Sequence, residues 1–319
     1  MVKKNYISVL LPVYNAEKFL AETLDSLLRQ TYKEFEIIAV NDGSTDGSLA
    51  ILEEYAARDQ RIVIVSRKNK GLVKTLNEAA QLASGEYLAR IDSDDIALPK
   101  RFELQIAAIN DSPDRVLIGG SFDVINEDGE ILYHDAVPTD FRDLLNAFRV
   151  RNPLAHGSVL IRKKAFEKAG GYSENCGPTE DYDLWVRLAK IGEIIAIKNT
   201  IFRWRVNSTG ITSTQSKTME KFMKKNLDSF WAENPYRLVS RKSLLSRGAN
   251  YVSVDTIGGI AMKEAVFHDV TEISLALVKR GAPLKGLAQL LLVALTGRTG
   301  FRIVSHRLRR MFRYHLLGR

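Results

Sequence analysis

The chain has 319 residues, of which 45% are hydrophobic and 26% are charged. This balance is typical of a globular protein and excludes a disordered or fibrous chain, and the length allows one large domain with an appendage or two modest domains. The net charge of +8 comes from one end of the sequence, because ten Lys and Arg residues and no acidic residue follow Glu272. Residues 1–272 therefore carry a small net negative charge.

Three features of the sequence bear on the cellular compartment of the protein. A single cysteine, Cys176, excludes an intramolecular disulfide and fits a reducing compartment. The N-terminal residues run into a strand-like segment without the apolar stretch of a signal peptide. The longest apolar run elsewhere, 290–295, is far shorter than the roughly 20 residues of a membrane span. We therefore expect a cytoplasmic protein.

The first 110 residues alternate between strand-like and helix-like segments. Buried-type apolar runs predict strands at 7–12, 36–40, 61–65 and 86–91. Apolar residues at helical spacing predict helices at 16–30, 46–57 and 72–83. Asn15 stands where the N-cap of the first helix is expected. This alternation predicts an α/β fold, Rossmann-like, with a mostly parallel central sheet flanked by helices.

The rest of the chain divides into two parts. Residues 111–215 are mixed, with strands predicted at 116–122 and 158–162 and a helix at 181–190. From about Thr214 onwards the pattern is wholly helical. We therefore predict a domain boundary near residue 215, followed by a helical, basic C-terminal extension at 216–319.

Polar residues follow three of the predicted strands, at the carboxyl ends where parallel sheets bind their ligands. Tyr14 follows the first strand and can stack on a flat base. Asp42 follows the second and can accept a hydrogen bond from a base or ribose. Asp92, Asp94 and Asp95 follow the fourth, and three carboxylates so close together repel one another unless a cation lies among them. Such ligands suit Mg²⁺ or Mn²⁺ carrying diphosphate oxygens.

Each of these features also has a plain structural explanation. Asp-Gly-Ser is an ordinary turn, and an acidic loop can cap a helix. Their coincidence at three successive strand ends favours a binding site. No G-x-G-x-x-G follows the first strand, which argues against a nicotinamide dinucleotide, and no G-x-x-x-x-G-K-[ST] is present, which argues against a P-loop NTPase.

The stretch from Ile7 to about Arg101 resembles the family 2 glycosyltransferases, which have the GT-A fold. The matching segments are 8–15, 40–46, Asn69-Lys70-Gly71, Asn77, Asp92-Ser93-Asp94-Asp95 and Pro99. The acidic segment resembles the D-x-D metal motif of that family. The similarity extends to Trp204 and covers about two thirds of the chain.

The resemblance implies a nucleotide-sugar site. Four residues would hold the base and ribose: Pro12, Tyr14, Glu17 and Asp42. Asp94 would coordinate Mn²⁺ or Mg²⁺, with Asp92 touching the ribose, the metal or the metal-bound phosphate, and Asp95 contacting the donor sugar. Lys68 and Arg90 would meet phosphate or donor.

A second set of candidates lies after residue 150. Gly177 to Trp185 resembles the Glu-Asp pair that begins a helix in this family, and in inverting members the Asp is the general base. The resemblance assigns Asp181 as the base and Glu180 as the group that orients the acceptor. The alternative is that both carboxylates only stabilise the N-terminus of their helix.

The segment 152–158 resembles the acceptor side of the family, so His156 would touch the leaving phosphates or the acceptor, although a lone His is often structural. Arg203-Trp204-Arg205 partly matches the Q-x-x-R-W motif of processive synthases, but Thr200 stands where Gln is required. That departure argues against a polymerising synthase. Arg203 or Arg205 would contact diphosphate, with a surface ion pair as the alternative.

The basic tail contains an amphipathic pattern over 300–316, which is typical of a helix on a membrane surface. The alternative is packing against the domain or a second subunit.

Together these features predict an inverting, metal-dependent, non-processive hexosyl- or N-acetylhexosaminyltransferase with a UDP-sugar donor and a saccharide or lipid-linked saccharide acceptor. The expected setting is bacterial surface polysaccharide or lipopolysaccharide assembly at the inner face of the cell membrane, without nucleic acid. An inactive scaffold that binds nucleotide-sugar or lipid, and a nucleotidyltransferase, remain as alternatives.

Overall fold

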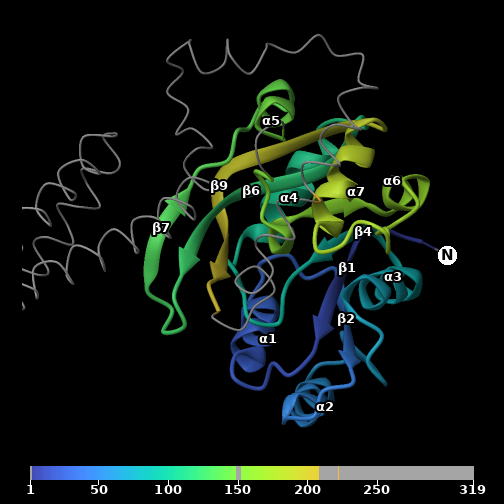
Figure 1. Ribbon diagram of the computed structural model, residues 1–319, viewed down its shortest axis with the longest axis vertical. Coiled ribbons are helices and arrows are strands. Elements are labelled where there is room, and N and C mark those ends of the chain that lie inside the picture. Colours follow the sequence, from blue (N-terminus) through green and yellow to red (C-terminus); the bar gives the residue numbers. More distant parts are fainter. Residues whose placement is uncertain (1, 149–151, 208–221, 223–319) are drawn as a thin grey trace, which may run out of the picture. The chain divides into compact units, whose positions relative to one another are not determined.

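The computed structural model describes residues 2–148, 152–207 and 222, and all but one residue of the predicted C-terminal extension lie outside them. Within the described residues a mixed β-sheet is flanked by helices (Figure 1). The strands are β1 (Lys3–Val13), β2 (Phe35–Asp42), β3 (Ile62–Arg67), β4 (Gly85–Arg90), β5 (Ile96–Ala97), β6 (Arg115–Ile125), β7 (Ile131–Asp135), β8 (Leu160–Arg162) and β9 (Glu193–Arg205). The helices are α1 (Leu20–Leu28), α2 (Ser48–Arg58), α3 (Leu72–Leu82), α4 (Arg101–Asn110), α5 (Phe141–Phe148), α6 (Lys163–Lys168) and α7 (Glu180–Ala189), with a 3₁₀ turn η1 (His156–Ser158).

The strands follow the order β3-β2-β1-β4-β8-β6-β9-β5, and β7 pairs with β6. The first four strands are parallel, as the alternation of strands and helices predicts. The short strand β8 runs antiparallel to both β4 and β6 and so joins this first half of the sheet to the second. The expected α/β fold is confirmed, with the addition that the second half of the sheet is mixed.

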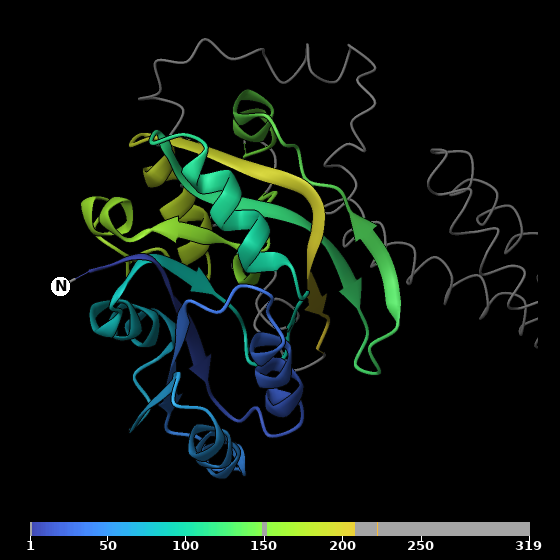
Figure 2. The same ribbon diagram turned by 180° about the vertical axis from the view of Figure 1, so that it is seen from behind.

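Helices cover both faces of the sheet, which explains why its central strands are continuous apolar runs. Figures 1 and 2 show α4 and α7 on opposite faces of the part formed by β6 and β9. In β1 the residues from Ile7 to Leu11 are all buried, with both faces of the strand shielded. Strands buried on both faces lose the in–out alternation of half-exposed strands. The core is one contiguous cluster that spans both halves of the sheet.

The predicted strands and helices of the first 110 residues are all present, within a few residues of their predicted ends. One detail is wrong. Asn15 does not cap α1, which begins at Leu20. Asn15 instead has a left-handed backbone with φ of 48°, and its Oδ1 accepts the N–H of Thr45 at 2.8 Å. Asn tolerates this conformation, and its amide finds its partner in the neighbouring loop.

Helix α4 was not predicted, because polar residues occupy its buried side. Arg101 and Gln105 are fully buried beside the apolar Phe102 and Ile109. The Gln105 amide donates to the carbonyl oxygens of Ile118 and Ser158, both at 2.8 Å. A helix that satisfies buried polar side chains in this way lacks a plain amphipathic pattern.

No helix among the described residues is long and apolar enough to cross a membrane.

Candidate active site

The carboxyl ends of β1, β2 and β4 meet at one edge of the sheet, as the sequence predicted. In the parallel register Pro12 lies beside Val40 of β2, and Leu10 lies beside Arg90 of β4. The segments that follow the three strands are therefore neighbours. Figure 1 shows β1, β2 and β4 side by side.

The loops after β1 and β2 are joined by hydrogen bonds and leave one aromatic ring in solvent. Glu17 accepts the N–H of Gly47 at 2.7 Å, and its own N–H donates to Asp46 at 3.1 Å. Asn15 makes the matching bond to Thr45. Tyr14 is 54% exposed, so its ring is available to a flat ligand.

Asp42 is buried and anchors the loop that leads into α3. Its carboxylate accepts the N–H groups of Lys70 at 2.7 Å and Gly71 at 2.9 Å, and it forms an ion pair with Arg67. These bonds fix the segment that carries Lys68. In this state the direct contact of Asp42 is with its own chain, and the loop that it orders forms the rim of the site.

Arg67 is a residue that the sequence did not single out. Besides Asp42 it contacts Glu78 at 2.6 Å and the Thr75 hydroxyl at 2.9 Å, so it ties β2 to α3. Its position at the end of β3, immediately before Lys68, was the one feature of the sequence that could have indicated a role at this edge of the sheet. The neighbouring acidic groups could be located only in space.

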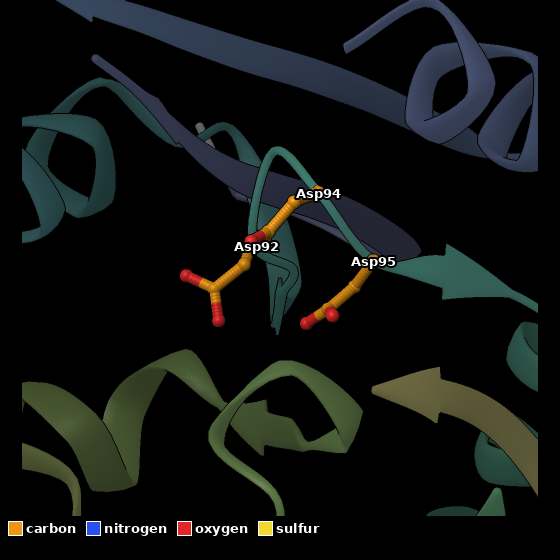
Figure 3. A group of neighbouring side chains, drawn as sticks. All are labelled: Asp92, Asp94 and Asp95. Atoms are coloured by element: carbon orange, nitrogen blue, oxygen red, sulfur yellow. The ribbon is translucent and has the colours of Figure 1, made fainter. Parts of the chain in front are cut away.

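The acidic loop after β4 brings three carboxylates together. One oxygen each of Asp92, Asp94 and Asp95 lies within 4.8 Å of the others, and the side chains of Asp92 and Asp95 extend to the same side of the loop (Figure 3). Burial and the charge of Asp92 raise the pKa of Asp94 to about 6. Burial and the charge of Asp94 raise the pKa of Asp95 well above its usual value. Carboxylates that repel one another in this way favour a cation among them.

The chemistry of this donor set fits a hard divalent cation. All three groups offer oxygen, the ligand that Mg²⁺ and Mn²⁺ prefer. Asp95 Oδ2 is buried without a hydrogen-bond partner, whereas Oδ1 accepts the backbone N–H of Arg205 at 2.8 Å. A buried, unpaired carboxylate oxygen is costly unless a proton or a cation satisfies it.

Arg90 lies behind this loop and is almost completely buried. Its guanidinium pairs with both oxygens of Asp92. Burial raises the pKa of Asp94, Glu180 and Asp181, and the charge of Arg90 opposes part of that rise in all three groups, which come from opposite halves of the chain. Arg90 is therefore the charged group shared by the acidic loop and the start of α7.

The two candidate arginines of β9 have different surroundings. Arg205 is buried, and its side chain donates to the carbonyl oxygens of Asp94 and Glu127, at 2.8 and 2.9 Å, and to Glu22. These contacts hold the acidic loop from behind, which favours a positioning role over the predicted contact with diphosphate. Arg203 is 36% exposed at its side chain and lies 3.7 Å from a carboxylate oxygen of Asp123.

The predicted Glu-Asp pair begins α7, as expected. Asp181 accepts the side-chain amide of Asn152 at 2.6 Å, and burial raises its pKa to about 6. Glu180 is buried, and burial together with the charge of Asp181 raises its pKa to about 7. Asn152 was within the segment noted in the sequence, but only the fold reveals its contact.

His156 packs against this pair and is neutral, because burial and the charge of Arg90 lower its pKa well below the usual value. Its Nδ1 lies 3.7 Å from Glu180, and its Nε2 lies 2.9 Å from the hydroxyl of Tyr172. The ring also contacts Trp185 of α7 edge-on. Tyr172 was not predicted, and nothing in its local sequence distinguished it.

Comparison with known proteins identifies the family of the chain. The model of glycosyl transferase family 2 matches residues 8–170. The glycosyltransferase EpsE of Bacillus subtilis is 35% identical over 194 residues, which cover 58% of this chain and 67% of EpsE. The amylovoran biosynthesis glycosyltransferase AmsE of Erwinia amylovora is 35% identical over 192 residues, covering 59% of this chain and 71% of AmsE.

Solved structures agree in fold. TarS of S. aureus (residues 1–349), in complex with UDP-GlcNAc, superposes with a TM-score of 0.60 at 20% identity and covers 72% of this chain and 68% of that one. The mannosyltransferase PcManGT from Pyrobaculum calidifontis, in complex with GDP-Man and Mn²⁺, has a TM-score of 0.54 at 17% identity, covering 95% and 79% of the two chains. From its sequence and its GT-A fold, the chain belongs to glycosyl transferase family 2.

Proposed function

We propose that the protein is an inverting, metal-dependent glycosyltransferase that moves one sugar from a nucleoside-diphosphate donor to an acceptor hydroxyl. The observation that carries this proposal is the shared environment of Arg90. The charge of Arg90 acts both on the carboxylates of the acidic loop, which could hold a cation, and on the carboxylates that begin α7, one of which could be the general base. Such a transfer needs these two groups on either side of one reacting carbon.

The donor would bind at the carboxyl ends of β1 and β2. The exposed ring of Tyr14 supports stacking on the base, beside Pro12. Glu17 and Asp42 order the two loops through hydrogen bonds to backbone N–H groups, and remaining carboxylate lone pairs would meet the ribose or base. Lys68 lies on the loop fixed by Asp42, from which it would reach phosphate.

Asp94 and Asp92 would hold Mn²⁺ or Mg²⁺, with Asp95 buried beneath them toward the donor sugar. The bound ion offsets negative charge on the departing diphosphate. Arg90 keeps Asp92 oriented, and Arg205 keeps the backbone of the loop in place. Arg203 is the more exposed of the two arginines of β9 and would be the one to approach the diphosphate.

Asp181 would be the general base. With a pKa near 6 it is mostly ionised at neutral pH and is a stronger base than an ordinary aspartate. The acceptor oxygen bonds to the anomeric carbon while the bond from that carbon to the diphosphate oxygen breaks, and Asp181 takes the hydroxyl proton. Because attack comes from the face opposite the diphosphate, the anomeric configuration inverts. Glu180 and His156 would orient the acceptor.

The biological setting is proposed from the relatives. AmsE is named for amylovoran biosynthesis, and TarS was solved with UDP-GlcNAc, which supports a UDP-hexose or UDP-N-acetylhexosamine donor and a role in surface polysaccharide assembly. The acceptor would be a saccharide or a lipid-linked saccharide. The protein would work in the cytoplasm, at the inner face of the membrane if the basic tail binds there.

The test is a panel of nucleotide-sugars incubated with the full-length protein and Mn²⁺ or Mg²⁺, with nucleoside diphosphate release as the readout. We expect metal-dependent release from one donor, lost in Asp94→Ala and strongly reduced in Asp181→Asn. Release of pyrophosphate would instead identify a nucleotidyltransferase. Donor binding without turnover, even with membrane extract as acceptor, would identify a scaffold.

A further inference from the structure

A continuous line of contacts runs from the donor half of the chain to the carboxylates at the start of α7. It begins just before α3, where Asp42 accepts the N–H groups of Lys70 and of the N-cap residue Gly71. Asn77, in the middle of α3, makes two hydrogen bonds to the backbone of Tyr172. Its side-chain amide donates to the Tyr172 carbonyl oxygen at 2.9 Å, and its side-chain carbonyl oxygen accepts the Tyr172 N–H at 3.0 Å. Residue 172 is thereby fixed although it lies 95 positions away in the sequence.

Gly171 makes these two hydrogen bonds possible. Its backbone has φ of 69°, in the left-handed region, and a Cβ placed there would lie only 2.8 Å from the side-chain oxygen of Asn77. Any larger residue would therefore strain the backbone and displace the Asn77 side chain from its two bonds to Tyr172. Tyr172 itself is buried, with its ring packed against Phe166 and His156.

The hydroxyl of Tyr172 lies 2.9 Å from Nε2 of His156. Burial raises the pKa of the hydroxyl and lowers that of the imidazole, so both groups are neutral and the phenol keeps its proton. On the other side of the ring, Nδ1 lies 3.7 Å from Glu180 Oε1, longer than a hydrogen bond. Which ring nitrogen carries the proton is decided by the bond that the other one makes.

We propose that Tyr172 is a positioning residue, whose hydroxyl donates to Nε2 of His156 and so places the imidazole proton on Nδ1, where it faces the carboxylate of Glu180. Above the Glu180 pKa of about 7, where Glu180 is ionised, a proton on Nε2 would instead turn a lone pair toward the carboxylate and repel it. Tyr172 therefore holds Glu180 beside Asp181 without touching either. This inference rests on the proposed function for the role of Glu180 with the acceptor, but its geometry can be tested separately.

The geometric test is nitrogen NMR of the imidazole rings in the full-length wild-type protein. The chain has only five histidines, so the signals of His156 can be assigned with His156→Gln. We expect His156 to be the neutral tautomer with the proton on Nδ1, and Tyr172→Phe to shift it toward the tautomer protonated on Nε2. An Nε2–H tautomer or an imidazolium at neutral pH in the wild type would overturn the proposal.

The functional test is a double-mutant cycle on Tyr172→Phe and Glu180→Gln, measured as nucleoside diphosphate release from the preferred donor with Mn²⁺. Loss of one hydrogen bond predicts a roughly 10-fold lower kcat for Tyr172→Phe with a nearly unchanged donor KM. In the Glu180→Gln background the same change should cost less than about twofold, because its effect passes through Glu180. Full additivity of the two effects would contradict a relay through Glu180.

Tyr87→Phe is the matched control. Tyr87 is also fully buried, and its hydroxyl bonds to Asn110 at 2.6 Å, but it lies on β4 away from the line of contacts to Glu180. We expect it to lower stability without changing kcat or the His156 signals. If the wild type releases no nucleoside diphosphate, the proposed function fails, whereas the tautomer and its dependence on Tyr172 still decide the positioning role.

Discussion

Burial changes the protonation of single carboxyl groups in this protein, and Asp181 gives the sharpest consequence. A pKa of about 6 means that Asp181 holds its proton to a higher pH than the ordinary value of 3.8 allows. A protonated base cannot accept the acceptor's proton, so turnover should fall about tenfold per pH unit below pH 6. The measurement is kcat between pH 4.5 and 8 at saturating Mn²⁺, which keeps Asp94 ionised.

Substitution checks the assignment of that pH profile. Asp181→Asn should lower kcat by roughly 10²–10⁴-fold and remove the break near pH 6, while the donor still binds. The neighbouring Asp183→Asn is a suitable control, because Asp183 pairs with Arg187 on the same helix. A profile whose break persists in Asp181→Asn would assign the ionisation to another group.

Glu180 predicts an effect on stability that has the opposite sign from that of a salt-bridged carboxylate. Its pKa is raised from 4.5 to about 7, so the folded state favours the protonated form. The stability that Glu180 contributes is complete below about pH 4.5 and is lost as pH rises through 7. At pH 8 the free energy of unfolding of Glu180→Gln should therefore exceed that of the wild type by on the order of 1–3 kcal/mol, seen as a higher Tm, and this advantage should be lost near pH 4. An equal difference at both pH values would argue against it.

The acidic loop predicts a metal effect that can be read without turnover. A cation that binds only the folded protein raises its stability, by about 2.7 kcal/mol at a concentration 100 times the Kd. Mn²⁺ should therefore raise the Tm of the wild type and leave Asp94→Asn nearly unchanged. Asp111→Asn serves as the control, since Asp111 pairs with Arg115 outside the acidic loop. Equal shifts in all three proteins would indicate non-specific binding.

At the scale of elements, the end of β9 supports the loop after β4. Arg205→Gln removes the bonds to Glu22 and to the carbonyl oxygens of Asp94, Asn126 and Glu127. It should destabilise the fold by on the order of 3 kcal/mol, because three carbonyl groups lose their charged donor. The shift of Tm caused by Mn²⁺ should also shrink. Calorimetry with and without Mn²⁺ measures both effects.

Arg162→Gln is the control for that experiment. Arg162 also donates to backbone carbonyl groups, those of Arg115 and Ile109, but it lies on β8 beside the start of β4. It should lose stability and keep the full Mn²⁺ shift. If Arg205→Gln keeps that shift as well, β9 does not position the acidic loop.

At the scale of the whole molecule, the basic tail predicts membrane association. Each Lys or Arg near an anionic surface contributes about 1 kcal/mol, and the apolar face of 300–316 would add to this. The full chain should float with anionic vesicles, and a chain ending at Thr296 should float less. Equal behaviour of the two would favour the alternative, in which the tail packs on protein.

The order of strands and helices up to residue 91 was predictable because local patterns specify it. Short apolar runs bounded by turn residues indicate buried strands, and apolar residues at helical spacing indicate helices. Parallel pairing brings the carboxyl ends of β1, β2 and β4 to one edge of the sheet, so the proximity of Tyr14, Asp42 and Asp92 was predictable from the sequence. The chain after residue 91 was less predictable, and α4 shows why, because it buries Arg101 and Gln105 in the core.

The sequence by itself determined the family, the fold class and the residue types at three strand ends, since these depend on local pattern and motif. Only the tertiary structure decided which groups contact one another across long separations. The fold places Arg90 near carboxylates from both halves of the chain, sets Arg205 against the acidic loop, and joins Asn77 to Tyr172, which in turn contacts His156. Such contacts depend on how two distant surfaces pack, and the raised pKa values of Glu180 and Asp181 follow from the burial that this packing creates.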